Sequence, residues 1–317
     1  MNALAAKPAG ARALKRRGFL FQLRRYWVSY LMILPVVVGF LVFSLYPNLW
    51  VIGMSLFRYA GFGEPVFYGI KNFTSTFSVL ERVWGTAIRN TFVFTVGKLA
   101  MELPLAMVLA VFLSGKLKGK TFFRAVYFLP NVTSPAVMSL VFYFLFSSYN
   151  GIINAYLLKL GVIIVPIEWL SRGNTALFVC MLVSVWQNFG INMVFFLSAI
   201  QAIPQDVYES AEIDGATGLK KFFYITAPLM GRMLQVILML AIIGTFKTFD
   251  IVKVLTNGGP GTSTEVMMTY IFRYFMGGGG TKPAFGYGSA LGVQAAALIA
   301  VVTAVYLYIS HKLDDVY

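Results

Sequence analysis

Residues 201–228 read QAIPQDVYESAEIDGATGLKKFFYITAP and form the longest polar interruption between two apolar runs. The flanking runs, 176–199 and 233–254, are each long enough to cross a bilayer, which takes about 20 apolar residues. The interruption carries four carboxylates and two lysines, which are costly in hydrocarbon. We therefore expect this segment to face water between two membrane spans.

The same segment has a helical pattern with a turn in its middle. Pro204 suits the first turn of a helix, and the apolar side chains that follow it fall along one side at helical spacing. Asp214-Gly215 supplies a turn, because glycine tolerates positive φ where the first helix must stop. A second short helix is expected over 217–224, ahead of Pro228. The pattern predicts a compact helix–turn–helix at the membrane face, and it leaves open a plain solvated loop.

The composition places the chain among membrane proteins. Hydrophobic residues make up 58% of the 317, charged residues only 12%, and the mean hydropathy is +0.75. The net charge of +14 would also suit nucleic-acid binding, but the basic residues lie near span ends and no nucleic-acid motif accompanies them. With Cys180 as the single cysteine and His311 as the single histidine, we expect no disulfide framework and no metal site, and the sequence contains no set of residues typical of a catalytic site. We predict an all-α polytopic membrane protein that is not an enzyme and does not bind nucleic acid.

Six apolar runs are candidates for transmembrane helices. The first is too long for the apolar core of a signal peptide and lacks a small-residue cleavage site, so we expect it to be retained. The expected spans are about 26–46, 90–113, 122–146, 175–199, 232–255 and 289–309. They lie in a transmembrane domain of residues 26–310 that includes the polar loop 201–231, with a basic tail at 1–25 and a short tail at 311–317.

Smaller features modify this plan. Pro130 and Pro135 are expected to bend the third span. The segments 152–165 and 266–275 are too short to cross and are expected to be surface helices.

The distribution of basic residues predicts the orientation. If the N-terminus lies in the cytoplasm, fifteen Lys and Arg fall in cytoplasmic segments and nine in outer segments. Basic residues favour the cytoplasmic side of a membrane protein. The predicted topology is therefore N-in and C-in, which places the loop 201–231 in the cytoplasm, where ATP is. The Gly115–Thr121 loop lacks the spacing of a phosphate-binding P-loop, so we expect no nucleotide in this chain.

Two pairs of charges fall within predicted spans. Lys98 and Glu102 are one helical turn apart, and Lys247 is three residues before Asp250. Intramembrane charges cost roughly 2.5–3.5 kcal/mol each on insertion scales, so they normally pair or line a cavity. We expect both sets to form buried pairs. The alternatives are a transport role for the first pair and, for Lys247, contact with an anionic sugar such as a uronate.

The polar loop resembles the EAA loop of the membrane subunits of bacterial ABC importers. The matching residues are Tyr208-Glu209-Ser210-Ala211, Asp214-Gly215-Ala216 and Ile225-Thr226-Ala227-Pro228. Ser210 stands where the first Ala is usual, and Ala227 stands where Leu is usual. In that family the loop is a coupling helix that docks in a groove on the ATPase subunit, so the resemblance implies ATPase coupling through Tyr208, Glu209, Ser210, Ala211, Asp214, Gly215, Ala216 and Pro228.

The resemblance extends over most of the chain and implies an assembly. From 201 to 260 the sequence is similar to the larger membrane subunits of maltose importers, without their large outer insertion. The family implies the ABC type I importer permease fold with six transmembrane helices in the bacterial inner membrane. It also implies a heterodimer with a sister permease, two ATPase subunits that hold ATP and magnesium, an extracytoplasmic solute-binding protein, membrane lipid and a sugar substrate.

The same resemblance implies a set of sugar-contacting positions in the fourth and fifth spans. Carrying the contacts of the maltose permeases across gives Ser184, Gln187, Asn188, Ile191, Ala241, Gly244, Thr245 and Thr248. Polar side chains in this set also suit hydrogen bonding between spans, which is the alternative interpretation.

A second function class remains open from the residues alone. An ion-coupled secondary transporter would use Lys98, Glu102, Lys247 and Asp250 as its ion relay. Transport by the purified chain on an ion gradient, without any ATPase, would favour that class.

Overall fold

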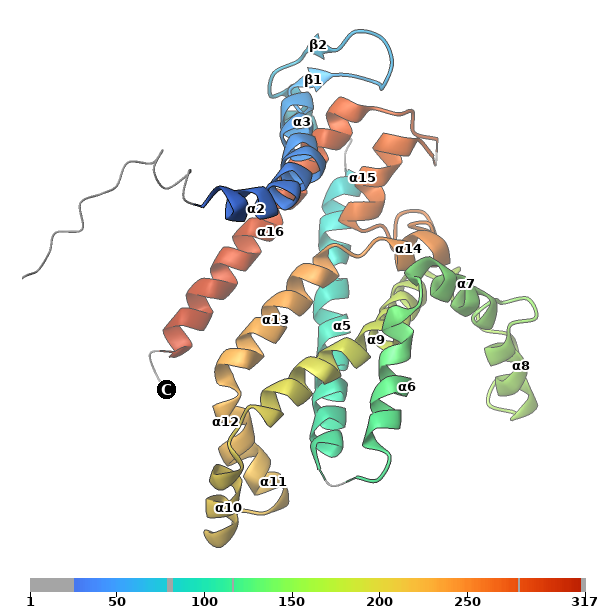
Figure 1. Cartoon of the computed structure of the whole chain (residues 1–317). Coiled ribbons are helices and arrows are strands. Elements are labelled where there is room, and N and C mark those ends of the chain that lie inside the picture. Colours follow the sequence, from blue (N-terminus) through green and yellow to red (C-terminus); the bar gives the residue numbers. More distant parts are fainter. Residues whose placement is uncertain (1–25, 79–81, 116, 279, 315–317) are drawn as a thin grey trace, which may run out of the picture. The chain divides into compact units, whose positions relative to one another are not determined.

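The computed structural model describes residues 26–78, 82–115, 117–278 and 280–314, and these are mostly helical (Figure 1). The predicted basic tail 1–25 and Lys116 lie outside the described residues. The chain divides into two compact units, Met1–Val51 and Ile52–Tyr317. The second unit carries all the residues of the candidate sites.

The first described helix is apolar on every side. It consists of α2 (Trp27–Phe40), a π-helical turn (Leu41–Leu45) and α3 (Tyr46–Met54), which together form 28 residues. None of these residues is buried. A helix that exposes apolar side chains all round suits a lipid environment. The helix covers the expected first span and continues eight residues beyond it.

The second unit is built around α9. The long helix α5 (Arg82–Ser114) packs along α9 (Gly173–Gln201), and α6 (Lys120–Val132) also packs against α9 (Figure 1). A Cβ atom on Gly190 of α9 would lie 2.0 Å from the carbonyl oxygen of Tyr127 on α6. Glycine therefore allows the two backbones to approach closely.

The third predicted span is sharply bent. Helices α6 and α7 (Pro135–Leu145) meet at 94°. The break falls just before Pro135 because a residue that precedes proline disfavours the helical conformation, and Thr133 and Ser134 are extended there. Among the described residues, five helices are long and apolar enough to cross a membrane, or six if the bent pair is one span.

The fifth predicted span is broken rather than continuous. Helix α13 (Gly231–Phe246) and helix α14 (Asp250–Leu255) are separated by the three residues 247–249. Helix α14 packs against α7 and α9 and buries Ile251, Val252 and Leu255. The break exposes backbone groups inside a predicted span, which is tolerated where the backbone lines a cavity.

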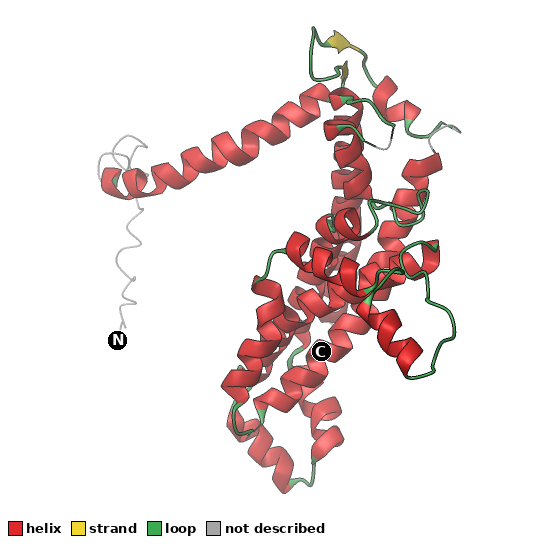
Figure 2. Cartoon of the chain, turned by 90° about the vertical axis from the view of Figure 1, so that its right-hand side faces the viewer, coloured by secondary structure: helices red, strands yellow, loops and turns green. Residues whose placement is uncertain are grey.

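The remaining elements close the unit. Helix α16 (Phe285–Asp314) packs against α15 (Met267–Met276) and α13. The predicted short helices are present as α8 (Ile152–Lys159) and α15. Two further elements were not predicted. They are an antiparallel pair of two-residue strands, β1 (Phe57–Arg58) and β2 (Val66–Phe67), yellow in Figure 2, and the short helix α4 (Lys71–Ser75).

The polar interruption folds as a helix, a turn and further short helices at one end of the unit. Helix α10 (Gln205–Ile213) is followed by Gly215 at φ +80° and by α11 (Gly218–Lys221). A π-helical turn (Phe222–Thr226) and α12 (Ala227–Leu229) then lead into α13. The expected helix–turn–helix is therefore present, with Gly215 in the left-handed conformation that the turn requires.

Candidate functional site

A cavity of about 300 Å³ lies among α5, α6, α9 and the broken fifth span. All eight positions expected to contact sugar line it, although they come from two stretches of sequence, 184–191 and 241–248, that are fifty residues apart. These are Ser184, Gln187, Asn188, Ile191, Ala241, Gly244, Thr245 and Thr248. Sugar contact at these residues stays a prediction, but the structure brings them together around one space.

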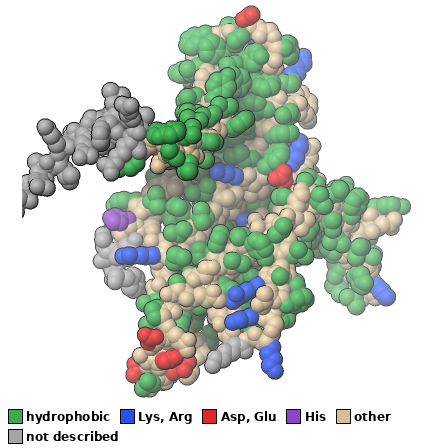
Figure 3. Space-filling model, in the orientation of Figure 1, with side chains coloured by type: hydrophobic (Ala, Val, Ile, Leu, Met, Phe, Trp, Pro, Cys, Tyr) green, Lys and Arg blue, Asp and Glu red, His purple; other side chains and the backbone are tan. Residues whose placement is uncertain are grey.

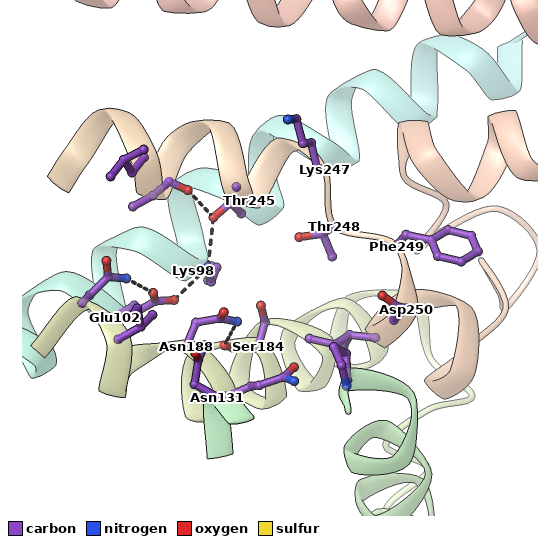
Figure 4. Close-up of a pocket in the computed structure, with 18 of the residues that line it drawn as sticks. Lys98, Glu102, Asn131, Ser184, Asn188, Thr245, Lys247, Thr248, Phe249 and Asp250 are labelled. Carbon is purple, nitrogen blue, oxygen red and sulfur yellow. Dashed lines mark hydrogen bonds and ion pairs between the residues drawn. The ribbon is translucent and has the colours of Figure 1, made fainter. Parts of the chain in front are cut away.

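The α9 wall of the cavity presents amides that are partly used within the protein. Gln187 donates from Nε2 to the carbonyl oxygen of Thr133 at 3.3 Å, which satisfies a group left free by the bend between α6 and α7. Asn188 donates from Nδ2 to the carbonyl oxygen of Ser184 at 2.9 Å (Figure 4). Each amide keeps its oxygen and a second N–H for other partners.

The broken span supplies the opposite wall. Gly244 and Thr245 lie in the last turn of α13, and Thr248 lies in the break, with its side chain directed into the space between α13 and α9 (Figure 4). Discontinuous helices near substrate sites are a recurring feature of membrane transporters. The geometry therefore suits a small polar solute held between α9 and the break.

The expected pair between Lys247 and Asp250 is not formed. Both side chains are exposed and line the cavity, and no ion pair joins them in the described part of the chain. Lys247 extends away from Asp250 (Figure 4). The prediction was wrong because it assumed a continuous helix, in which residues three apart are neighbours. The break removes that spacing.

The expected pair between Lys98 and Glu102 is formed. Nζ of Lys98 lies 2.9 Å from Oε2 of Glu102, and the residues are 5% and 0% exposed. Lys98 also donates to Oγ1 of Thr245 at 2.9 Å, and Glu102 Oε1 accepts from Nδ2 of Asn192 (Figure 4). Both charged residues also line the cavity, so the same two residues form the ion pair and part of the cavity wall.

Other cavity residues were not identified from the sequence. They are Asn131, Pro135, Asn192, Phe195, Leu240, Phe249 and Ile251. Asn131 gave a usable signal, because it is a polar residue beside Pro130 in an apolar run. The apolar members gave none, since they look like ordinary lipid-facing or core positions.

The loop at the α10 end forms a distinct surface. Asp206, Glu209, Glu212 and Asp214 are exposed there, and acidic side chains gather at this end of the molecule in Figure 3. Large apolar side chains are exposed beside them, including Ile213 at 88% and Tyr224 at 79%. A hollow of about 700 Å³, lined by Tyr208 and Glu209 among others, lies next to α10.

This surface is held in shape by contacts between α10 and the segment that follows it. Lys221 pairs with Glu212 at 2.5 Å, and its Nζ lies 4.9 Å from the centroid of the Tyr208 ring. The Tyr208 hydroxyl in turn lies 3.2 Å from Oγ1 of Thr226. Ala211 is buried, so α10 is packed on one side and presents the other side outward. Within the described ranges, no three His, Cys, Asp or Glu side chains gather as metal ligands.

Comparison with known proteins identifies relatives over most of the chain. Residues 102–315 match the family of binding-protein-dependent transport system inner membrane components. The chain is 34% identical to the arabinooligosaccharides transport system permease protein of Bacillus subtilis, over 89% of this chain and 88% of that protein. It is 33% identical to the trehalose/maltose transport system permease protein of Thermococcus litoralis, over 91% of this chain and 95% of that protein.

The fold also matches a solved structure. A chain of a bacterial ABC transporter involved in the import of the acidic polysaccharide alginate superposes with a TM-score of 0.79 and 23% identity. The match covers 92% of this chain and 98% of that chain. At this identity the likeness concerns the fold alone.

Proposed function

Because the chain belongs to the family of binding-protein-dependent transport system inner membrane components, we propose that it carries a sugar or oligosaccharide across the bacterial inner membrane as a permease of an ATP-driven importer. The family consists of permease subunits, so the chain is a multi-pass transport subunit and not an enzyme. The assembly that we propose comprises a sister permease, two ATPase subunits with ATP and magnesium, and an extracytoplasmic binding protein.

The polar groups that line the cavity support a carbohydrate substrate. Ser184, Gln187 and Asn188 face Thr245 and Thr248 across it, which gives hydroxyl and amide groups on both sides. Such groups suit the donors and acceptors of sugar hydroxyls. Two of the relatives above are named for arabinooligosaccharides and for trehalose and maltose, which supports a carbohydrate substrate.

An acidic sugar is the substrate that we favour within this class. Lys247 is an exposed cation on the cavity lining and has no ion pair among the described residues. Asp250 is the first residue of α14, where a carboxylate complements the positive end of the helix. Lys247 therefore contributes a positive charge to the cavity lining that Asp250 does not neutralise.

We expect Lys247→Gln to weaken the import of an acidic trisaccharide selectively. Loss of a charge-assisted hydrogen bond should raise the KM for trimannuronate about tenfold, which is ~1.4 kcal/mol, and leave the KM for maltotriose unchanged. The measurement is initial uptake into proteoliposomes that contain the whole importer. Lys253→Gln is the matched control, because Lys253 bonds Asn257 at 2.7 Å and is not part of the cavity lining. Equal effects on both sugars would reject a role in selecting acidic substrates.

The α10 surface is the site that we propose for ATPase coupling. It combines exposed carboxylates with exposed apolar side chains on a short helix that is buried only at Ala211, so most of its surface is available to a groove on a partner. The loop continues through α12 directly into α13, which carries Thr245 and ends at the cavity. Movement of α10 by an ATPase would therefore reach the cavity through one short path.

The secondary-transporter alternative has less support. Lys98 and Glu102 neutralise one another, while Lys247 and Asp250 stay apart, so the four groups do not form a continuous relay. Co-reconstitution of the whole importer tests the proposal. Oligosaccharide uptake should require the ATPase subunits and ATP, whereas uptake by this permease on an ion gradient without them would overturn it.

A further inference from the structure

The buried pair of Lys98 and Glu102 is an expensive feature of the fold. Two charges removed from water lose several kcal/mol of hydration each, and a well-packed apolar pair is often equally stable. Both residues lie on α5, one helical turn apart, in the longest helix of the second unit. Their placement on the cavity lining, rather than between helices alone, indicates a use beyond packing.

Three helices fix the position of the Lys98 ammonium. Glu102 on α5 lies 2.9 Å from Nζ, and Thr245 on α13 accepts a hydrogen bond from it at 2.9 Å. Thr245 donates its own proton to the carbonyl oxygen of Ala241 at 2.7 Å, so it acts toward Lys98 as an acceptor. Asn192 on α9 holds the other oxygen of Glu102.

One hydrogen of the ammonium remains unused. A lysine ammonium has three N–H donors; Thr245 accepts a hydrogen bond from one of them, and the Glu102 carboxylate at 2.9 Å is the ion-pair partner of the second. No third acceptor for Lys98 occurs in the described part of the chain. A buried charged donor left without an acceptor costs free energy. A substrate oxygen in the cavity would remove that cost.

We propose that Lys98 is a substrate-contacting residue that donates this third N–H to a hydroxyl or ring oxygen of the sugar. This inference rests on the proposed use of the cavity for carbohydrate. Glu102 already neutralises the charge of Lys98, so this end of the cavity favours an uncharged oxygen. Lys247, which has no such partner, serves a carboxylate. The two lysines therefore orient an acidic sugar, with its carboxylate at the break and its hydroxyls at α5.

The test replaces the whole pair, so that no orphan charge is left behind. Lys98→Met/Glu102→Met in the reconstituted importer should raise the KM for maltotriose about tenfold or more. The maximal rate and the thermal midpoint should change little, because a paired replacement by apolar side chains is often neutral for stability. The control is Glu265→Met/Arg273→Met, which removes an ion pair outside the cavity between a buried carboxylate and a partly exposed arginine and should leave KM unchanged.

The outcomes separate this inference from the proposed function. An unchanged KM in the folded double variant would overturn the role of Lys98. Thr248→Leu, at the other end of the cavity, should also raise KM. If neither variant changes KM, the cavity is not the sugar site and the proposed substrate site fails as well.

A second variant keeps the inference testable if the double variant does not fold. Glu102→Gln keeps the side-chain volume and a carbonyl acceptor but leaves the charge of Lys98 uncompensated. It should lower the KM for trimannuronate relative to that for maltotriose, because a free ammonium favours a carboxylate. An unchanged ratio of the two KM values would count against direct contact.

Discussion

Glu209→Lys is expected to reduce ATP-driven uptake at least tenfold while the permease still folds. Glu209 is exposed on the outward side of α10, and its carboxylate accepts a hydrogen bond only from Gln205 at 2.8 Å among the described contacts. Reversal of its charge should therefore cost little in this chain. In a docked interface the reversed charge would face the groove that had received a carboxylate, which typically costs ~2–5 kcal/mol. Uptake and ATPase activity of the reconstituted importer are the measurements.

The control for this prediction is another charge reversal on an exposed carboxylate. Glu168→Lys lies outside α10 and should leave uptake within about twofold of the original protein. Gly215→Pro is a companion variant that disturbs the same surface without charge, because proline cannot adopt the φ of +80° found there. Normal uptake by either α10 variant would count against docking at this loop.

Arg273→Met is expected to cost the fold about 3–5 kcal/mol. Glu265 is fully buried, and its Oε2 accepts a hydrogen bond from Arg273. Without the arginine, the carboxylate would be an uncompensated charge in a tight site, where a Cβ on Gly258 would lie 2.4 Å from Oε2. The thermal midpoint of the purified importer should fall, whereas Arg82→Met, at an exposed arginine, should leave it nearly unchanged.

The pH dependence of this loss has a definite sign. Burial raises the pKa of the Glu265 carboxyl above its ordinary value, and contacts with Thr269 and Arg273 offset part of that rise. Removal of Arg273 should raise the pKa further. Protonation then favours the folded state, so the lost stability returns as pH falls below the raised pKa and is fully restored below about 4.3. Glu265→Gln/Arg273→Met should abolish the pH dependence, and a midpoint of Arg273→Met that falls with acidification would contradict this account.

The helices were largely predictable because apolar run length is a strong signal in membrane proteins. Each of the six predicted runs contains a helix or a bent helix pair, and the loop at 201–231 has its helix, turn and glycine where the pattern placed them. The 94° angle between α6 and α7 was not predictable in size. Prolines indicate a bend, but its angle depends on what the two halves pack against, here α9 and α14.

The cavity shows where sequence reasoning stops. The pair of Lys98 and Glu102 follows from helical spacing, but its partners Thr245 and Asn192 are nearly a hundred residues or more away. The break at residues 247–249 contains no proline or glycine, so the residues of the break do not include the usual sequence signals for the end of a helix. The pair of Lys247 and Asp250 was predicted wrongly because this break was not foreseen. The N-in and C-in orientation stays a prediction from the distribution of basic residues.

One crosslinking measurement tests the central claim that α10 docks on an ATPase subunit in the cytoplasm. Cys180 is the sole cysteine of the sequence and is buried, so Ile213→Cys, at a side chain 88% exposed, introduces a single accessible thiol. A thiol-to-amine crosslinker should join position 213 to the ATPase subunit in inside-out vesicles, and ATP should change the yield. Labelling of this thiol from outside intact cells, or no crosslink to the ATPase in the assembled importer, would contradict the account.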